Sequence, residues 1–219
     1  MEFIPFAIFG GMIVLFVLVA VFSFLAERKR CREMEAVAGE LGLQFAAEGS
    51  PQIPGLGQFA LFNRGRNRTF FNTMQGRVEG VRVAVFDYRF TTGSGKSRTT
   101  HQLTVCAIFD GRLDLPRFEL KPEGFWQKLG ALFGYQDIDF PENAEFSRSY
   151  VLRGQNEEQI RSAFTAGVLA FFGARPGLYV EGGDDTIIFF RADRRLATSE
   201  IRGFLTEGIR GLLAFRTRC

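Results

Sequence analysis

The chain has a single histidine, His101, so any imidazole chemistry must be built around it. Residues 81–92 and 98–109 both alternate apolar and polar side chains, as two neighbouring strands do. Pairing their apolar positions sets residue i opposite residue 190 − i, which places Arg89 opposite His101 and Asp87 on the same face. A carboxylate and a guanidinium there could orient an imidazole for proton transfer. We favour a plainer interpretation, a polar rim that closes the end of a core and satisfies the histidine by hydrogen bonds.

Two acidic residues, Asp137 and Asp139, form the best candidate for a cation site. Residues two apart in an extended segment point to the same side, and paired carboxylates can bind a divalent cation or act as acid and base. Acidic side chains are also usual in surface turns, and we favour that interpretation. The cysteines, Cys31, Cys106 and Cys219, have neither the spacing of zinc ligands nor that of a disulfide framework. The sequence therefore predicts no metal centre.

The segment GSGKS, residues 93–97, resembles part of a phosphate-binding loop but lacks the spacing that such a loop needs. A Walker motif has another glycine five residues before Gly95, and that position is Phe90. A phosphate-binding loop also joins a strand to the N-terminus of a helix, whereas this segment joins two expected antiparallel strands. We therefore expect an exposed hairpin tip, and neither a nucleotide nor any other cofactor.

An apolar run near the N-terminus precedes all of these residues in the chain. Phe3 to Leu25 holds 23 residues without a charge. At 1.5 Å per residue the run reaches roughly 34 Å, enough for a hydrocarbon core of about 30 Å. A cleavable signal peptide would end in small residues, whereas Phe22, Phe24 and Leu25 end this run. Residues 1–26 are therefore predicted to be an uncleaved transmembrane anchor.

Basic side chains follow the apolar run directly and predict its orientation. Membrane proteins keep such residues on the cytoplasmic side, so we expect a single-pass protein of the inner (plasma) membrane with its N-terminus outside. The rest of the chain is then cytoplasmic, and the unpatterned cysteines agree with a reducing compartment. These basic residues are also predicted to contact anionic lipid: Arg28, Lys29, Arg30 and Arg32.

A second basic region spans residues 61–100, where eight Lys and Arg side chains and two acids give a net charge of +6. Near a membrane this region could rest on anionic headgroups, and a solvated sheet edge is the alternative. Nucleic-acid binding is not expected, because the whole chain has a net charge of only +3 and no nucleic-acid-binding motif.

Periodicity after the anchor indicates an α+β fold, in which helices pack on a mainly antiparallel sheet. Residues 27–42 are expected to be a juxtamembrane helix, 43–146 a lobe built on a β-meander, and 147–219 a lobe of strand, helix, strand, strand and helix. The two lobes are either one domain or divide near Phe146. The expected strands are 43–46, 69–75, 81–92, 98–109, 117–123, 150–153, 177–181 and 186–191, and the later helices are 124–134, 157–172 and one from about 198.

Four segments follow the anchor and the basic helix in a recognisable order: VFDYRFTTGSGKSRTTHQLTV, LPRFELKPE, IDFPENAEFSRSYVLRG and VEGGDDTIIFFR. This order resembles a group of small bacterial proteins anchored by one membrane-spanning helix, to which no activity is assigned. The similarity covers most of the chain after the anchor. It implies a bacterial inner-membrane setting, and it supplies neither an activity nor site residues.

These observations predict a membrane-tethered cytoplasmic module that binds a membrane or cytoplasmic protein, with the lipid bilayer as its other partner. The alternative is a membrane-associated enzyme that uses His101 with nearby carboxylates. The two differ in what the structure must contain. An enzyme requires a concave pocket where catalytic side chains converge, and a binding module requires an exposed apolar or charged surface.

Overall fold

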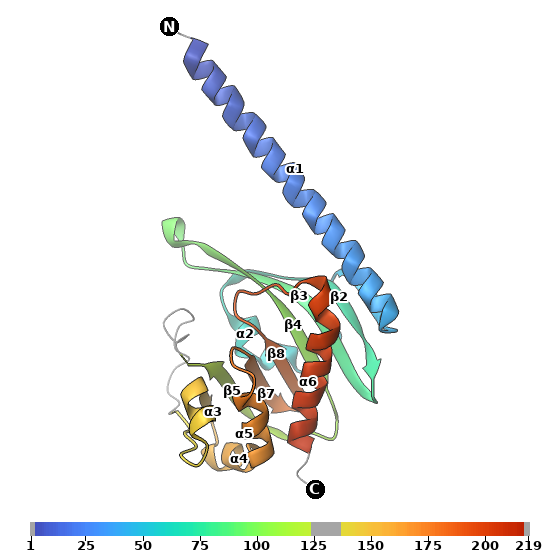
Figure 1. The fold of residues 1–219 in the computed structure, drawn as a ribbon, viewed down its shortest axis with the longest axis vertical. Coiled ribbons are helices and arrows are strands. Elements are labelled where there is room, and N and C mark those ends of the chain that lie inside the picture. The colour runs from blue at the N-terminus through green and yellow to red at the C-terminus, as the bar shows by residue number, and fades with distance from the viewer. Residues whose placement is uncertain (1–2, 124–136, 217–219) are drawn as a thin grey trace.

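The computed structural model describes residues 3–123 and 137–216, with side chains from Gly11 onward. Its first element, α1 (Phe3–Glu40), is one unbroken helix that contains both the predicted anchor and most of the predicted juxtamembrane helix. Gly42 follows its end with a φ of 67°, a left-handed conformation that glycine adopts without steric cost. Figure 1 shows α1 projecting as a rod from the rest of the chain.

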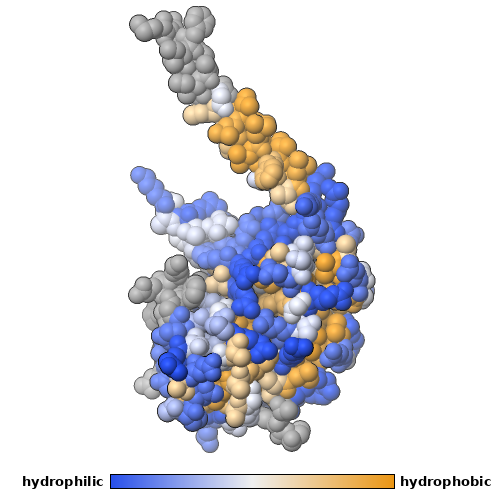
Figure 2. All heavy atoms as spheres, in the orientation of Figure 1, coloured by the Kyte–Doolittle hydropathy of each residue, from blue (hydrophilic) through white to orange (hydrophobic). Residues whose placement is uncertain are grey.

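Among the residues that the structure describes, α1 is the one helix long and apolar enough to cross a membrane. Its large apolar side chains from Met12 to Leu25 are exposed. Figure 2 shows this apolar rod in orange, ending where the hydrophilic surface of the sheet and its helices begins. An exposed apolar surface of this extent is unfavourable in water and favourable in lipid.

The rest of the described chain is built on one sheet of eight antiparallel strands, which confirms the predicted α+β class. The strands follow the order β1-β2-β3-β4-β8-β7-β5-β6 across the sheet. Their bounds are β1 (Gln44–Glu48), β2 (Arg66–Val78), β3 (Val81–Thr92), β4 (Thr99–Phe109), β5 (Leu115–Pro122), β6 (Tyr150–Gly154), β7 (Tyr179–Asp184) and β8 (Thr186–Phe190).

The predicted register between β3 and β4 was wrong by one residue. Arg82 pairs with Phe109 and Phe90 pairs with His101, so residue i lies opposite 191 − i. A slip of one residue moves every side chain of one strand to the other face relative to its partner. Alternation could not distinguish the two registers, because both faces of these strands are apolar and buried.

Each face of the sheet is covered by different helices. On one face, α6 (Ile201–Arg216) packs against β4 and β8, and Met34 and Ala38 of α1 belong to the same core. On the other face, η1 (Leu56–Gln58) and α2 (Ala60–Asn63) cover a cluster of aromatic rings. There the ring of Phe62 meets that of Tyr88 edge-on, with centroids 5.0 Å apart.

The helix expected at 157–172 is two helices, α4 (Glu157–Ala163) and α5 (Ala166–Gly173). The break lies at Phe164, which leaves the helical conformation, and at Thr165, which is the N-cap residue of α5. A short helix, α3 (Ala144–Ser149), was not predicted, although the Asn143 side chain caps it by accepting a hydrogen bond from the backbone N–H of Phe146.

Two further expectations concern the middle of the chain. The helix expected at 124–134 lies outside the described residues. The lobe boundary considered near Phe146 falls between β5 and β6, which pair with each other, so the sheet continues across it.

The last helix begins as a short turn, η3 (Thr198–Glu200), and continues as α6.

Candidate functional site

Asp87, one of the candidate catalytic residues, lies at the junction between α1 and the sheet. Its side chain is fully buried. It accepts hydrogen bonds from Arg30 Nε and Nη2 at 2.8 Å each, Arg195 Nε at 3.1 Å, Thr104 Oγ1 at 2.9 Å and Asn72 Nδ2 at 3.0 Å. A paired arginine and carboxylate of this geometry fixes the two elements that carry them.

Arg195 extends this cluster toward the apolar part of α1. Its Nη1 and Nη2 donate to the two carboxylate oxygens of Glu27, each at 2.5 Å. Burial by itself would raise the pKa of Asp87, but the hydrogen bonds and charges of Arg30 and Arg195 outweigh burial and lower that pKa below its usual range. Asp87 is therefore ionised at neutral pH and holds α1 on the sheet.

The structure does not bring His101, Arg89 and Asp87 together as predicted. Because Phe90 and not Arg89 lies opposite His101, the histidine is on the other face of the sheet from Asp87. Arg89 is exposed and lies over the ring of Phe71. This prediction was wrong because the expected register between β3 and β4 was off by one residue.

His101 instead forms a chain with a hydroxyl and another carboxylate. Its Nε2 lies 2.7 Å from Thr92 Oγ1, and its Nδ1 lies 2.6 Å from Asp193 Oδ1. The ring stacks on Phe90 with centroids 4.7 Å apart and is buried. A hydroxyl, an imidazole and a carboxylate in this order can activate the hydroxyl as a nucleophile, and the same contacts also satisfy a buried histidine.

The four basic residues after the apolar run have two different environments. Arg30 turns inward to Asp87 and so belongs to the junction. Arg28, Lys29 and Arg32 are exposed on the turns that follow the apolar run. Lipid contact through these three side chains stays a prediction.

Asp137 and Asp139 are both exposed, and Ile138 between them is buried. The Asp137 carboxylate pairs with Arg153, and the backbone carbonyl of Asp139 accepts a hydrogen bond from Arg161 Nη1 at 2.7 Å. Within residues 3–123 and 137–216, no group of three or more His, Cys, Asp or Glu side chains is arranged to hold a metal ion.

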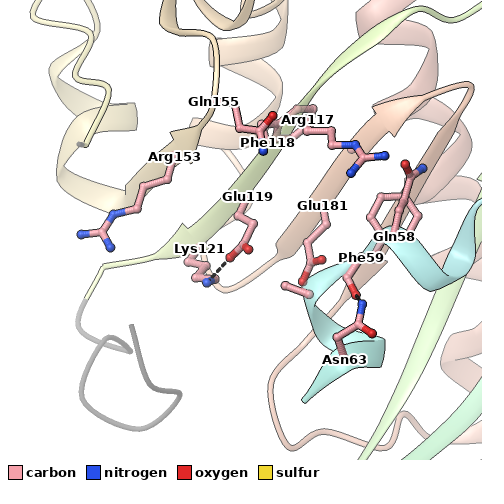
Figure 3. Close-up of a pocket in the computed structure, with 12 residues that line it drawn as sticks. Gln58, Phe59, Asn63, Arg117, Phe118, Glu119, Lys121, Arg153, Gln155 and Glu181 are labelled. Carbon is pink, nitrogen blue, oxygen red and sulfur yellow. Dashed lines mark hydrogen bonds and ion pairs between the residues drawn. The ribbon is translucent and has the colours of Figure 1, made fainter. Parts of the chain in front are cut away.

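A cavity of about 280 Å³ opens between the end of the sheet and the η1 and α2 segment (Figure 3). It involves β5, β6 and β7, whereas α1 packs on β1 and β2 at the other edge of the sheet. Its lining combines aromatic rings with charged and amide side chains: Gln58, Phe59, Asn63, Arg117, Phe118, Glu119, Lys121, Arg153, Gln155 and Glu181.

Glu181 is the buried carboxylate of this cavity, and Figure 3 shows it pointing from β7 toward α2. The backbone N–H of Leu61 donates to its two oxygens, at 3.1 and 3.4 Å. Glu119 lies opposite it on β5 and forms an ion pair with Lys121. Burial, and secondly the charge of Glu119, raise the pKa of Glu181 to about 8. A carboxyl group that holds its proton near neutral pH can both donate and accept hydrogen bonds.

The sequence pattern did not reveal this cavity because the expected strand 177–181 ended at Glu181, whereas β7 continues to Asp184. Glu181 in fact lies inside a buried strand, where an acid is rare unless it has a partner or a function. A second sequence signal of this cavity was present in the segment RFELKP, residues 117–122. Its alternation places Arg117, Glu119 and Lys121 on one face of β5, a charged row within the sheet.

No model of a known protein family matches the chain, and no curated protein matches it in sequence. Its fold is similar to the crystal structure of the mycobacterial trehalose monomycolate transport factor A, TtfA, with a TM-score of 0.59 and 16% sequence identity. The similarity covers 86% of this chain and 93% of that one. At this identity the likeness shows a shared fold.

Proposed function

We propose that the chain is a membrane-tethered interaction module whose domain faces the cytoplasm and binds a partner at the cavity around Glu181. The observation that carries this proposal is the cavity itself. It is concave, it presents polar groups beside aromatic rings, and it lies at the edge of the sheet remote from α1. A partner in the cytoplasm can reach it while α1 stays in the bilayer.

Two observations support the tether and its orientation. The apolar part of α1 is exposed and long enough to span a bilayer. The exposed Arg28, Lys29 and Arg32 that follow it favour a cytoplasmic position for the domain. TtfA, which is similar in fold, is described as a transport factor, and that description suits a role in binding.

A reporter fused after Cys219 tests the orientation. We expect an enzyme that is active only in the cytoplasm to function there, and an enzyme that requires the periplasm to be inactive. The opposite pattern would place the domain outside and remove the orientation from the proposal.

Photo-crosslinking in the native membrane tests the cavity. A photoreactive phenylalanine analogue at Gln155, an exposed residue of the cavity lining, should yield a discrete adduct. The same analogue at Glu79, exposed in the turn between β2 and β3, should yield none. Ala60→Trp narrows the cavity and should abolish the Gln155 adduct. Equal adducts at both positions, or an adduct unaffected by Ala60→Trp, would refute the cavity as the binding site.

The chain of Thr92, His101 and Asp193 supports a second candidate function, an enzyme in which His101 activates the Thr92 hydroxyl. These residues do not line the cavity around Glu181. A serine-hydrolase probe of the fluorophosphonate class tests this candidate directly. It should label the wild-type chain and not Thr92→Val if Thr92 is a nucleophile, and absence of labelling would leave His101 as a structural residue.

A further inference from the structure

The hairpin between β3 and β4 reaches toward the side from which α1 projects. It ends in the short turn η2 (Gly95–Ser97) and extends beyond the rest of the sheet (Figure 1). In Figure 2 the blue tip of the hairpin lies at about the height at which the orange part of α1 meets the hydrophilic surface. Because membrane-spanning helices are tilted by about 20° on average and by up to about 40°, a membrane that α1 crosses obliquely, as it leans in Figure 1, would pass close to this tip.

The exposed charges of the hairpin are all positive. Residues 93–100 are exposed and include Lys96 and Arg98, and the neighbouring Arg66 donates to the Gly93 carbonyl at 3.0 Å. There is no acidic residue in 64–78 or in 88–109. The acid at the base of the hairpin, Asp193, is bound by His101.

We propose that the β3–β4 hairpin docks on the anionic lipid headgroups of the membrane that α1 crosses. The domain is then held at two places, by α1 and by the hairpin, and the cavity around Glu181 is turned away from the bilayer. The inference rests on the membrane tether of the proposed function. Anionic phospholipid is the partner because the tether itself brings the basic tip to a headgroup surface, so a weak electrostatic contact suffices.

The experiment uses the full chain in lipid nanodiscs with a fluorescent label at Ser97→Cys. Cys31 and Cys219 are replaced by Ser, and the buried Cys106 is retained. A matched label at Glu79→Cys reports on the opposite end of β3. In discs that contain phosphatidylglycerol, a headgroup-attached quencher should quench the label at 97 and not the label at 79. In discs of phosphatidylcholine alone, both labels should stay unquenched.

Charge variants test the cause of the docking. Lys96→Gln with Arg98→Gln should lower the equilibrium constant for the docked hairpin roughly 30-fold, and salt should weaken docking of the wild type. The matched control, Arg77→Gln with Arg210→Gln, removes two exposed charges elsewhere and should leave quenching unchanged.

Three results would overturn the inference. Equal quenching in the two lipids would show that charge does not hold the hairpin, and a water-exposed label in both would show that it does not dock. Protection that appears only when a cytoplasmic extract or nucleic acid is added would assign the surface to another partner. Failure of the chain to assemble into discs at all would instead refute the membrane tether of the proposed function.

Discussion

The ionisation of one buried side chain, Glu181, makes the stability of the fold depend on pH. Its pKa in the folded chain is about 8, above the ordinary value of 4.5, so folding takes up a proton between these values. Stability contributed by this group is therefore fully present below about pH 4.5 and decreases as the pH rises toward 8. In the proposed function the carboxyl group meets a partner in its neutral form, and its ionisation lowers the stability of the fold.

Glu181→Gln keeps an acceptor for the Leu61 N–H and cannot ionise. We expect it to raise the free energy of unfolding at alkaline pH by about 1–3 kcal/mol and to flatten its decrease with pH. Thermal unfolding of the full chain in detergent, followed by circular dichroism across the pH range, measures both effects. Glu158→Gln removes an exposed carboxylate and serves as the control. A Glu181→Gln profile parallel to that of the wild type would contradict the raised pKa.

Two substitutions at His101 distinguish a structural role of this residue from a catalytic one. His101→Ala leaves Thr92 and Asp193 without their partner and should cost about 1–3 kcal/mol of unfolding free energy. His101→Gln keeps a hydrogen-bonding side chain and should remain folded, but it cannot transfer a proton near neutral pH. Unfolding curves and a cellular complementation assay on both variants give the answer. Folded but inactive His101→Gln protein would favour the enzyme, and an active one would make His101 part of the scaffold.

At the scale of elements, α6 packs closely on the sheet because it places glycines where it crosses the strands. An ideal Cβ on Gly208 would lie 2.9 Å from Cys106 Sγ, and one on Gly211 would lie 2.8 Å from the ring of Phe189. Both partners are buried, so they have little room to move. The gain in backbone rigidity that alanine normally brings to a helix is therefore outweighed at these two positions.

Three alanine variants of α6 test this packing. Gly208→Ala and Gly211→Ala should each lower the free energy of unfolding by about 1–3 kcal/mol through overpacking. Gly203→Ala has nothing within 4 Å of its added Cβ and should raise the free energy by up to about 1 kcal/mol. Denaturant unfolding of the three variants checks the prediction. A stabilising Gly208→Ala would mean that α6 lies farther from β4 than described.

In the whole molecule, the junction at Asp87 sets the orientation of the sheet and its helices relative to α1. Arg30 and Glu27 of α1 are joined through Asp87 and Arg195 to the sheet and to the segment before α6. The lowered pKa of Asp87 means that its contribution to stability is present above about pH 4, and is lost as the pH falls through its folded-state value. Acid should therefore release α1 from the domain.

Arg30→Gln removes one of the two cations that balance the buried Asp87 carboxylate. We expect a loss of about 3 kcal/mol, and a broader distribution of spin-label distances between α1 and the sheet than in the wild type. Arg32→Gln, at an exposed position on the same helix, should change neither quantity. Adding Asp87→Asn to Arg30→Gln should recover part of the loss, since no unpaired charge remains. Unchanged distances in Arg30→Gln would show that other contacts fix the helix.

Local sequence signals are enough to predict most elements of the fold. The long uncharged run of α1, the stop at Gly42, the strands that alternate and the exposed tip at Lys96 each depend on residues near one another in the chain. The α+β class follows from these elements. The break at Phe164 was missed because the apolar helical spacing continues across it.

Contacts between residues far apart in the chain could be found only in the folded structure. Asp87 meets Arg30 across 57 positions and Glu27 meets Arg195 across 168, distances over which no sequence periodicity carries information. The register of β3 and β4 was decided in the same way, since both faces of the pair are apolar and only the packing of α6 and α2 distinguishes them. The cavity around Glu181 exists because β5 inserts between β7 and β6, which places Glu119 opposite Glu181 although they are far apart in sequence.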